Sequence, residues 1–381
     1  MLKIFMASNL EVPFVDLTRQ FIDLESDFIS AFSTIGRSGS YILGPEVEQF
    51  EQAIADYCGV KHAIGVGDGS AALFLPLKAL DIGRGDEVVT AANSFIASAW
   101  VIAAAGATPV LTDVSDDLNM CPRSLASAIS PRTRAIMPVH LAGHPADMDV
   151  ITNIATEAGI PIIEDAAQAI GARYKGRQVG SFGLAAGFSL HPLKNLRVYG
   201  DGGFITTNDD ALADKVRLLR NHGLKSRDDC VVWGYNSRLD SIQAAIALIK
   251  LKHLPRWNQR CREIAECYRR GLEGFVKNPK VRPNVESVYH NFIIETPYRD
   301  ALAKHLKGEG IGTAIHYPVP IHLQKAAKHL GYRKGSFPVT ESLCETMLSL
   351  PIYPHLTDSE VDYVVDRVVS FFKQSDQGER V

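Results

Sequence analysis

The feature that most constrains the fold is a regular alternation of short apolar segments with helical segments between residues 61 and 207. Chains with this alternation form βαβ units, in which a mostly parallel sheet carries helices on both faces. Because ligands of such sheets bind outside the carboxyl ends of the strands, we expect the functional residues at that edge. Helices are expected at Ser70–Leu80 and Ala97–Ala105. The seven expected strands are His62–Val66, Glu87–Thr90, Thr108–Asp113, Ala135–Val139, Pro161–Glu164, Ala185–Ser189 and Gly203–Thr206.

The pattern changes after about Leu239. With 381 residues the chain is roughly twice as long as a typical single domain. We therefore predict a large α/β domain over residues 1–250, with an N-terminal arm, and a smaller α+β domain over residues 251–381. The elements expected in the second part are a long helical stretch at Asp240–Gly274 interrupted by Pro255, strands at Tyr289–Glu295 and near Thr313–His316, and helices at Arg299–Lys307 and Asp358–Phe372.

Composition and charge exclude several classes of function. The 40 Lys and Arg against 43 Asp and Glu leave a formal net charge of -3, which provides no basic surface for nucleic acid. The six cysteines include no CxxC pair. We therefore expect free thiols, with neither a metal site nor a disulfide framework.

Two segments bear on targeting and membranes. The N-terminal stretch, residues 1–14, is too short and too polar for a secretory signal. The segment Ala91–Thr112 holds no charged residue and is long enough for a membrane helix, but Gly106 and Pro109 interrupt it. We expect a buried helix followed by a strand there instead, and a cytoplasmic protein with no membrane partner.

A glycine-rich turn connects the first expected strand to the first expected helix. The strand runs into three alternating glycines, the last of which is Gly69, and the helix opens at Ser70. Such a helix start offers unpaired backbone N–H groups to a phosphate. A dinucleotide is not favoured, because Asp86 and Glu87 precede the next strand and lie at the wrong edge of the sheet to hold a ribose. A plain tight turn is the alternative.

Two further strand ends carry ionisable residues. One strand ends on Asp165, which needs a cationic partner if it is buried, although a helix N-cap is an equal alternative. Lys194 follows the strand that ends near Ser189, in an apolar, glycine-rich neighbourhood. A lone loop lysine is usually a surface residue, but desolvated lysines form Schiff bases with aldehydes. Pyridoxal phosphate (PLP) needs a phosphate site, a carboxylate at its ring nitrogen and a lysine at its aldehyde, and all three converge here.

Because it combines these features, the sequence closely resembles the sugar aminotransferases of the DegT/DnrJ/EryC1/StrS family, which are fold-type I enzymes that use PLP. The resemblance implies a large domain with a mostly parallel seven-stranded sheet and a smaller α+β C-terminal domain. It covers nearly the whole chain and is carried by VPFVDLTRQ, SYILGPEVEQFE, GDEVVTAANSFIASA, PVHLAGHPADM, IIEDAAQAIGA, HPLKNLRVYGDGGFITTND, RNHGLKS, NSRLDSIQAAI, IHYPVPIHLQ and LSLPIYPHL.

The resemblance assigns roles around the coenzyme ring. Lys194 would join the coenzyme aldehyde and later carry the proton between the substrate carbon and the cofactor. Asp165 would keep the ring nitrogen protonated, so that the ring acts as an electron sink. Gln168, one expected helical turn further, would bind near the ring hydroxyl. Phe95 would stack on the ring, with a core aromatic as the alternative.

The resemblance also assigns the phosphate site and implies a homodimer. Gly69 and Ser70 would bind the phosphate through backbone N–H groups, and the Ser70 hydroxyl and Ser189 would assist. Most relatives carry threonine in place of Ser70, a mild departure. Asp68, where Ser or Asn is common, should point away from the phosphate. Asn236 is similar to the asparagine that reaches the phosphate from the neighbouring subunit, so the active site would need two chains.

The implied reaction is a ping-pong transamination between PLP and pyridoxamine phosphate (PMP). L-glutamate would donate the amine, and a keto-sugar, most simply a nucleotide-linked 3-keto or 4-keto deoxysugar, would accept it. A keto-sugar phosphate and a cyclitol ketone are alternative acceptors. Dehydratase relatives replace the lysine with histidine, whereas Lys194 is retained and His191 lies three residues away. A PLP-dependent sugar dehydratase and a non-catalytic regulator are therefore the less favoured hypotheses.

Several residues are candidates for contacts with the acceptor. His316 and Tyr317 carry over from the family's HYP motif, together with Arg238. Lys225 and Arg227 could meet a diphosphate, although a solvated loop is the favoured interpretation of that segment. Two more histidines are weaker candidates. His140 ends a strand at the ligand edge, and His322 is either a site residue or a surface histidine.

Overall fold

The computed structural model describes residues 10–376, so the first nine residues of the stretch examined for a secretory signal lie outside it. All seven expected strands are present. They form two ladders, β3-β2-β4 and β1-β9-β8-β5. Isolated parallel bridges connect the two ladders, one from Ile136 to Ile162 and one from Val139 to Asp165. The strands are β1 (His62–Val66), β2 (Glu87–Ala91), β3 (Thr108–Thr112), β4 (Thr133–Met137), β5 (Ile163–Asp165), β8 (Ala185–Ser189) and β9 (Gly203–Thr207).

The direction of the strands confirms a mostly parallel sheet. Strand β2 pairs in parallel with β3 and β4, and β5 pairs in parallel with β8. Strand β9 runs antiparallel to both of its neighbours, β8 and β1. The combined order β3-β2-β4-β5-β8-β9-β1 is the sheet of the predicted fold class.

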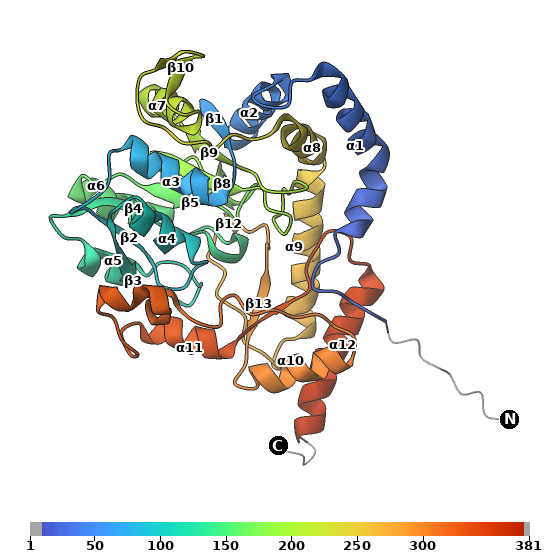
Figure 1. Ribbon diagram of the computed structural model, residues 1–381. Helices are drawn as coiled ribbons and strands as arrows, with labels where there is room; N and C mark the ends of the chain where they lie inside the picture. The colour runs from blue at the N-terminus through green and yellow to red at the C-terminus, as the bar shows by residue number, and fades with distance from the viewer. Residues whose placement is uncertain (1–9, 377–381) are drawn as a thin grey trace.

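Helices cover both faces of the sheet because its strands are apolar on both sides. Along β1, Ala63 packs with Phe50 of helix α2, whereas Ile64 packs on the other face with Leu75 of α3 and Val216 of α7. Figure 1 shows the sheet between these layers. The helices of this part are α1 (Thr18–Ser38), α2 (Pro45–Cys58), α3 (Gly69–Ala79), α4 (Ala97–Ala104), α5 (Pro122–Ala128), α6 (Met148–Ala158), α7 (Asp210–Arg220) and α8 (Ser241–Leu251).

The uncharged segment Ala91–Thr112 forms the expected helix and strand, but the helix is only partly buried, with Trp100 54% exposed. The segment forms the last residue of β2, the short helix α4 and strand β3. Over residues 10–376 no helix combines the length and the apolar character that crossing a bilayer requires. Short strands elsewhere in the chain are β6 (Arg173–Tyr174), β7 (Arg177–Gln178), β10 (Leu224–Ser226), β11 (Asp229–Cys230) and β12 (Val285–Glu286).

The C-terminal part has its own hydrophobic cluster, which includes Tyr268, Phe292, Leu302 and Val364, and to which Val12 of the N-terminal segment also contributes. Figure 1 shows this part beside the sheet, with the long helix α9 running from α8 down to α10 and α12. The domain boundary at residue 250 stays a prediction. The elements of this part are α9 (Leu254–Gly271), β13 (Phe292–Glu295), α10 (Arg299–Gly308), α11 (Pro338–Thr346), β14 (Met347–Leu350) and α12 (Asp358–Asp376).

The expected interruption of the long helical stretch is confirmed, whereas one expected strand is wrong. The long helical stretch is two helices, since it breaks after Leu251 and Pro255 occupies the first turn of α9, where proline is tolerated. The strand expected near Thr313–His316 is wrong, because Ala314 makes a single bridge to Ser349. The side chain of His316 also contacts Ser349, with its Nδ1 2.9 Å from the Ser349 hydroxyl.

Candidate active site

A cavity of about 490 Å³ opens at the carboxyl ends of β1, β5 and β8. It lies at the edge of the sheet where the sequence predicts the functional residues. Eight of the predicted site residues line this cavity, namely Gly69, Ser70, Phe95, Asp165, Ser189, Lys194, His316 and Tyr317. The other three, Gln168, Asn236 and Arg238, do not line it.

Lys194 lies in a turn after β8, where its backbone N–H donates to the carbonyl of His191 at 2.8 Å. Surrounding protein desolvates the amine and lowers its pKa to about 8, while the Asp165 carboxylate acts in the opposite direction. A lysine with this pKa has a substantial neutral fraction near neutral pH, which is the form that attacks carbonyls.

Asp165 ends β5 and faces the same cavity as Lys194. Its Oδ2 accepts a hydrogen bond from the Ser98 hydroxyl at 2.6 Å, and its Oδ1 accepts one from the Ala167 N–H at 3.2 Å. Burial raises the pKa of Asp165, whereas these two donors and Lys194 oppose that rise. The alternative of a helix N-cap is wrong, because residues 166–170 form turns with no helix.

Helix α3 begins at the floor of the cavity. Asp68 is its N-cap, with Oδ1 accepting from the Ala71 N–H at 2.8 Å, so this carboxylate is held by the helix even though it lines the cavity. Gly69 allows a close approach to the end of β8, since an added Cβ would lie 2.6 Å from the Cβ of Ser189. The first turn of α3 and Ser189 at the end of β8 therefore lie side by side on the cavity.

Gln168 lies behind the cavity and positions Tyr317. Its Oε1 accepts from the Ala142 N–H at 2.7 Å, and its Nε2 donates to the Tyr317 hydroxyl at 3.1 Å. The Phe95 ring is 54% exposed, so the alternative of a core aromatic is wrong. Its centroid lies 5.9 Å from that of Tyr317.

The remaining candidates lie outside this chain's own cavity. Asn236 is exposed and bridges to Asn221, whose Oδ1 accepts from Arg238 Nη1 at 3.0 Å. Lys225 and Arg227 are exposed in the β10–β11 hairpin, in agreement with the favoured interpretation of a solvated loop.

Both of the weaker histidine candidates are buried beside a glutamate. His140 Nε2 lies 3.0 Å from Glu164 Oε2, and His322 Nε2 lies 2.9 Å from Glu341 Oε1. Neither histidine lines the cavity, so each serves packing and hydrogen bonding inside the fold.

Sequence reasoning missed three residues at this site. Ser98 holds Asp165, and Trp100 and His290 line the cavity. The only signal for Ser98 was its polarity in the otherwise apolar helix α4, where a buried hydroxyl needs a partner. Trp100 and His290 gave no signal, because packing across the chain brings them to the cavity.

Comparison with known proteins identifies the family. The model of the DegT/DnrJ/EryC1/StrS aminotransferase family matches residues 23–369. The chain belongs to this family.

Two relatives and one solved structure resemble the chain over nearly its whole length. The chain is 44% identical to a pleiotropic regulatory protein of Geobacillus stearothermophilus, over 96% of this chain and 99% of the relative. It is also 44% identical to the dTDP-3-amino-3,4,6-trideoxy-alpha-D-glucose transaminase of Streptomyces venezuelae, over 97% and 99%. The structure of S. venezuelae DesV in complex with a ketimine intermediate superposes with a TM-score of 0.94, at 44% identity and over 97% and 99% of the two chains.

Proposed function

We propose that this family member is a PLP-dependent aminotransferase that moves an amino group from L-glutamate to a nucleotide-linked keto-sugar. The observation that carries the proposal is the placement of Lys194 and Asp165 on one cavity, with the start of helix α3 beside them. This is the arrangement of amine, carboxylate and phosphate site that PLP requires.

The residues present fit the coenzyme. The first N–H groups of α3, at Gly69 and Ser70, would hold its phosphate together with the Ser189 hydroxyl. Asp165, held by Ser98, would face the ring nitrogen, and the half-exposed Phe95 would cover the ring. When bound, PLP supplies the electron sink that stabilises a carbanion at the substrate carbon.

The protein's own part in the reaction is binding and proton movement. Lys194, with a pKa near 8, can both accept and release a proton at its Nζ in the working pH range. Asp165, which accepts hydrogen bonds from Ser98 and Ala167, would hold the ring nitrogen. Tyr317, fixed by Gln168, and His316 lie on the side of the cavity formed by the C-terminal part, where we place the sugar.

The proposed acceptor is a nucleotide-linked 3-keto or 4-keto deoxysugar. The name of the S. venezuelae relative specifies a dTDP-linked sugar with an amine on carbon 3, which supports a nucleotide-linked acceptor for this chain. The name of the G. stearothermophilus relative supports a regulator instead, but a regulator has no need for a buried aspartate facing a lysine of lowered pKa. PLP and PMP are the two proposed forms of the coenzyme.

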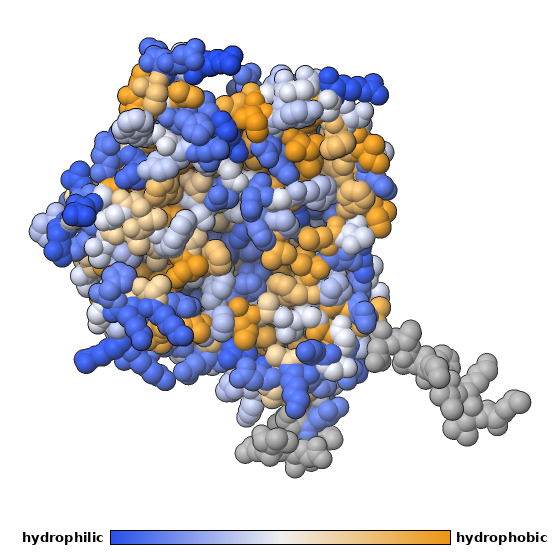
Figure 2. All heavy atoms as spheres, viewed as in Figure 1, coloured by the Kyte–Doolittle hydropathy of each residue, from blue (hydrophilic) through white to orange (hydrophobic). Residues whose placement is uncertain are grey.

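We also propose a homodimer that works in the cytoplasm. The six cysteines are free thiols, as a reducing compartment favours. Asn236 and Arg238 are absent from the cavity of their own chain, which agrees with a role at the site of a partner chain. Apolar side chains are exposed along α1, where Ile22, Ile29 and Phe32 are each more than half exposed. Figure 2 shows apolar surface over this helix.

The first test concerns Lys194. The purified protein supplied with PLP should absorb in the violet, L-glutamate should shift the band toward the near ultraviolet, and a keto-sugar should restore it. Lys194→Ala should abolish the violet band and lower turnover by several orders of magnitude, since covalent attachment and proton transfer are both lost.

Lys304→Ala is the matched control, because Lys304 is an exposed lysine on α10. Substantial turnover in Lys194→Ala would refute the proposal. A wild-type protein that binds PLP but shows no half-reaction with glutamate would favour the dehydratase.

A further inference from the structure

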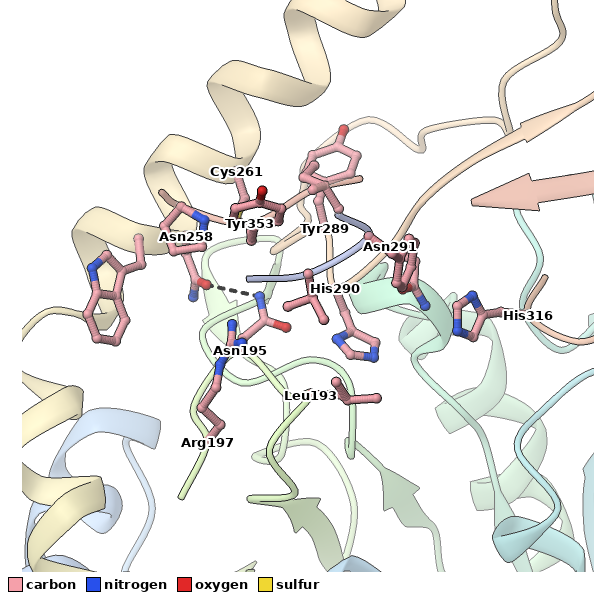
Figure 3. Close-up of a pocket in the computed structure, with 15 residues that line it drawn as sticks. Leu193, Asn195, Arg197, Asn258, Cys261, Tyr289, His290, Asn291, His316 and Tyr353 are labelled. Carbon is pink, nitrogen blue, oxygen red and sulfur yellow. Dashed lines mark hydrogen bonds between the residues drawn. The ribbon is translucent and has the colours of Figure 1, made fainter. Parts of the chain in front are cut away.

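A second, smaller cavity lies next to the proposed active site. Its volume is about 60 Å³, which suits one small ion or chemical group. Figure 3 shows side chains converging on it from three directions, with Asn195 and Arg197 from the Lys194 loop, Asn258 and Cys261 from α9, and His290 from the segment before β13. The cavity therefore lies where α9 and the C-terminal part meet the loop that carries Lys194.

Arg197 is a buried cation without a counterion in this cavity. Its side chain is 6% exposed, and its Nε and Nη1 have no hydrogen-bond partner. Within residues 10–376 no carboxylate forms an ion pair with it. Burying a guanidinium without a partner destabilises the folded state, and a bound anion would offset that cost.

Lys250 is a second buried amine near Arg197, outside the lining of the cavity. It is fully buried, its Nζ has no hydrogen-bond partner, and it lies 4.1 Å from the centroid of the Tyr199 ring. Burial lowers the pKa of Lys250 to about 7, with repulsion from Arg197 as the second cause, and burial lowers the pKa of Arg197 to about 10. Arg197 is thus the cation that lines the cavity, and Lys250, which does not line it, adds positive charge when it is protonated.

The uncharged side chains of the cavity also include a hydrogen-bond donor without a partner. The Tyr353 hydroxyl is buried without a partner. The amide of Asn195 is fixed, since its Nδ2 donates to Asn258 Oδ1 at 3.2 Å and to the carbonyl of Val288 at 3.1 Å. The unpartnered buried atoms that line the cavity are one acceptor, Asn195 Oδ1, and the donors Arg197 Nε, Arg197 Nη1, Asn291 Nδ2 and the Tyr353 hydroxyl, so donors outnumber acceptors.

We propose that this cavity binds one small anion, either a carboxylate group or a halide ion, with Arg197 as its counterion and the Tyr353 hydroxyl as a further donor. The cavity adjoins the larger one, because Leu193, His290 and His316 line both. A carboxylate could therefore belong to a molecule that also occupies the larger cavity. Binding of the ion does not depend on the proposed transaminase activity, and only its assignment to the amino donor rests on that proposal.

Bromide is the direct probe of this site. Crystals of the holoenzyme grown without halide and then soaked in sodium bromide should show an anomalous peak beside Arg197. This measurement uses the wild-type protein and so does not depend on whether an Arg197 variant folds.

Thermal unfolding tests the same site in solution. Sodium chloride should raise Tm by about 3 °C at a hundredfold excess over the dissociation constant, relative to a bulky sulfonate salt at equal ionic strength. Arg197→Gln should remove this difference. Arg134→Gln should keep it, because Arg134 is an exposed arginine that lies outside the cavity and pairs with Asp86 at 4.0 Å.

Kinetics then distinguishes the two sources of the anion. If the site takes the carboxylate of the amino donor, chloride should raise the KM for L-glutamate severalfold with kcat unchanged, and Arg197→Gln should raise it without chloride. If the site holds an inorganic ion, chloride should raise Tm and leave KM unaffected. No bromide at Arg197, together with the same response of Tm to both salts, would overturn the proposal whatever the enzyme's activity.

Discussion

Hydrogen bonds from the Ser98 hydroxyl at 2.6 Å and from the Ala167 N–H at 3.2 Å reach the two carboxylate oxygens of Asp165. Both hydrogen bonds favour the charged form of the carboxylate, whereas burial raises its pKa. Ser94 lies behind this pair, with its hydroxyl 2.7 Å from that of Ser98. The acidity of Asp165 therefore depends on a hydroxyl from helix α4, and the ability of Asp165 to face a protonated ring nitrogen depends on that acidity.

Ser98→Ala should raise the pKa of Asp165 and lower kcat by about tenfold to a hundredfold, because a hydrogen bond to a charged group is worth about 1.5–3 kcal/mol. The pH dependence of kcat and of the PLP absorbance should shift upward on its acidic limb. Ser94→Ala is the matched control, since Ser94 does not contact Asp165, and its effect should be smaller. Equal pH profiles for wild type and Ser98→Ala would show that Ser98 only packs.

Lys250 predicts a dependence of stability on pH. Burial lowers its pKa from 10.5 to about 7, so between pH 7 and 10.5 the unfolded state binds more protons than the folded state. The free energy of unfolding should therefore rise with pH over this range, and the full penalty of burying a charged lysine is present below pH 7. Lys250→Met should stabilise the protein by about 1–3 kcal/mol at pH 7, and this gain should shrink toward pH 10.

Urea denaturation at several pH values measures this effect without adding an anion. Lys252→Met is the control, because Lys252 is exposed at the end of the same helix. Its effect should stay within about 0.5 kcal/mol at every pH. A constant difference between wild type and Lys250→Met across the pH range would contradict the prediction.

At the scale of elements, the junction between the start of α3 and the end of β8 determines the shape of the proposed phosphate site. A methyl group on Gly69 would lie 2.6 Å from Ser189 Cβ and 3.1 Å from its Cα, closer than van der Waals contact allows. Gly69→Ala must therefore push α3 away from β8. The expected cost is about 1–3 kcal/mol of stability and a loss of PLP affinity of tenfold or more, measured by urea denaturation and by absorbance titration.

Gly36→Ala is the matched control for this change. Gly36 lies inside helix α1 with no atom within 4 Å of an added Cβ, so alanine should stabilise that helix by up to about 1 kcal/mol and leave PLP affinity unchanged. If Gly69→Ala binds PLP as tightly as Gly36→Ala does, the close approach of the two elements has no role in holding the phosphate.

The strands were predictable because each is a short apolar segment bounded by turn residues, and this local signal survives folding. By contrast, the absence of a helix after Asp165 was not predictable. Residues 166–170 favour a helix by composition, yet the Ala166 N–H donates to the carbonyl of Gly187 at 2.9 Å, and Gly171 has a positive φ of 86°. Contacts with a neighbouring strand override the local preference there.

The same distinction applies to the site. Lys194 and Asp165 were predictable, because both follow strand ends whose edge the βαβ pattern determines. The hydrogen bond between Ser98 and Asp165 spans 67 positions of sequence, and only the packing of α4 against the end of β5 creates it. Arg197 gave no signal either, since an arginine in a loop is usually solvated and its burial follows from the position of α9.

At the scale of the whole molecule, the β10–β11 hairpin and the segment after it extend beyond the sheet (Figure 1) and carry apolar side chains outward. Trp233 is 92% exposed, next to the exposed Val231 and Val232. A tryptophan in this position buries a large area when it meets a partner, and Asn236 follows it by three residues. The hairpin therefore places Asn236 where a second copy of the chain could receive it.

Complementation between two inactive variants tests whether the sites are shared. Asn236→Asp would set a carboxylate against the proposed phosphate of the partner's coenzyme, and Lys194→Ala removes the amine of its own site. If the two residues serve different chains, a mixture refolded together should recover roughly a quarter of the wild-type activity, since half of the random dimers are mixed and each has one intact site. Separately refolded and then mixed proteins are the control when subunits exchange slowly. Failure to recover activity, with mixed dimers confirmed by mass spectrometry, would place Asn236 at the site of its own chain and leave the exposed Trp233 without a role in assembling the active site.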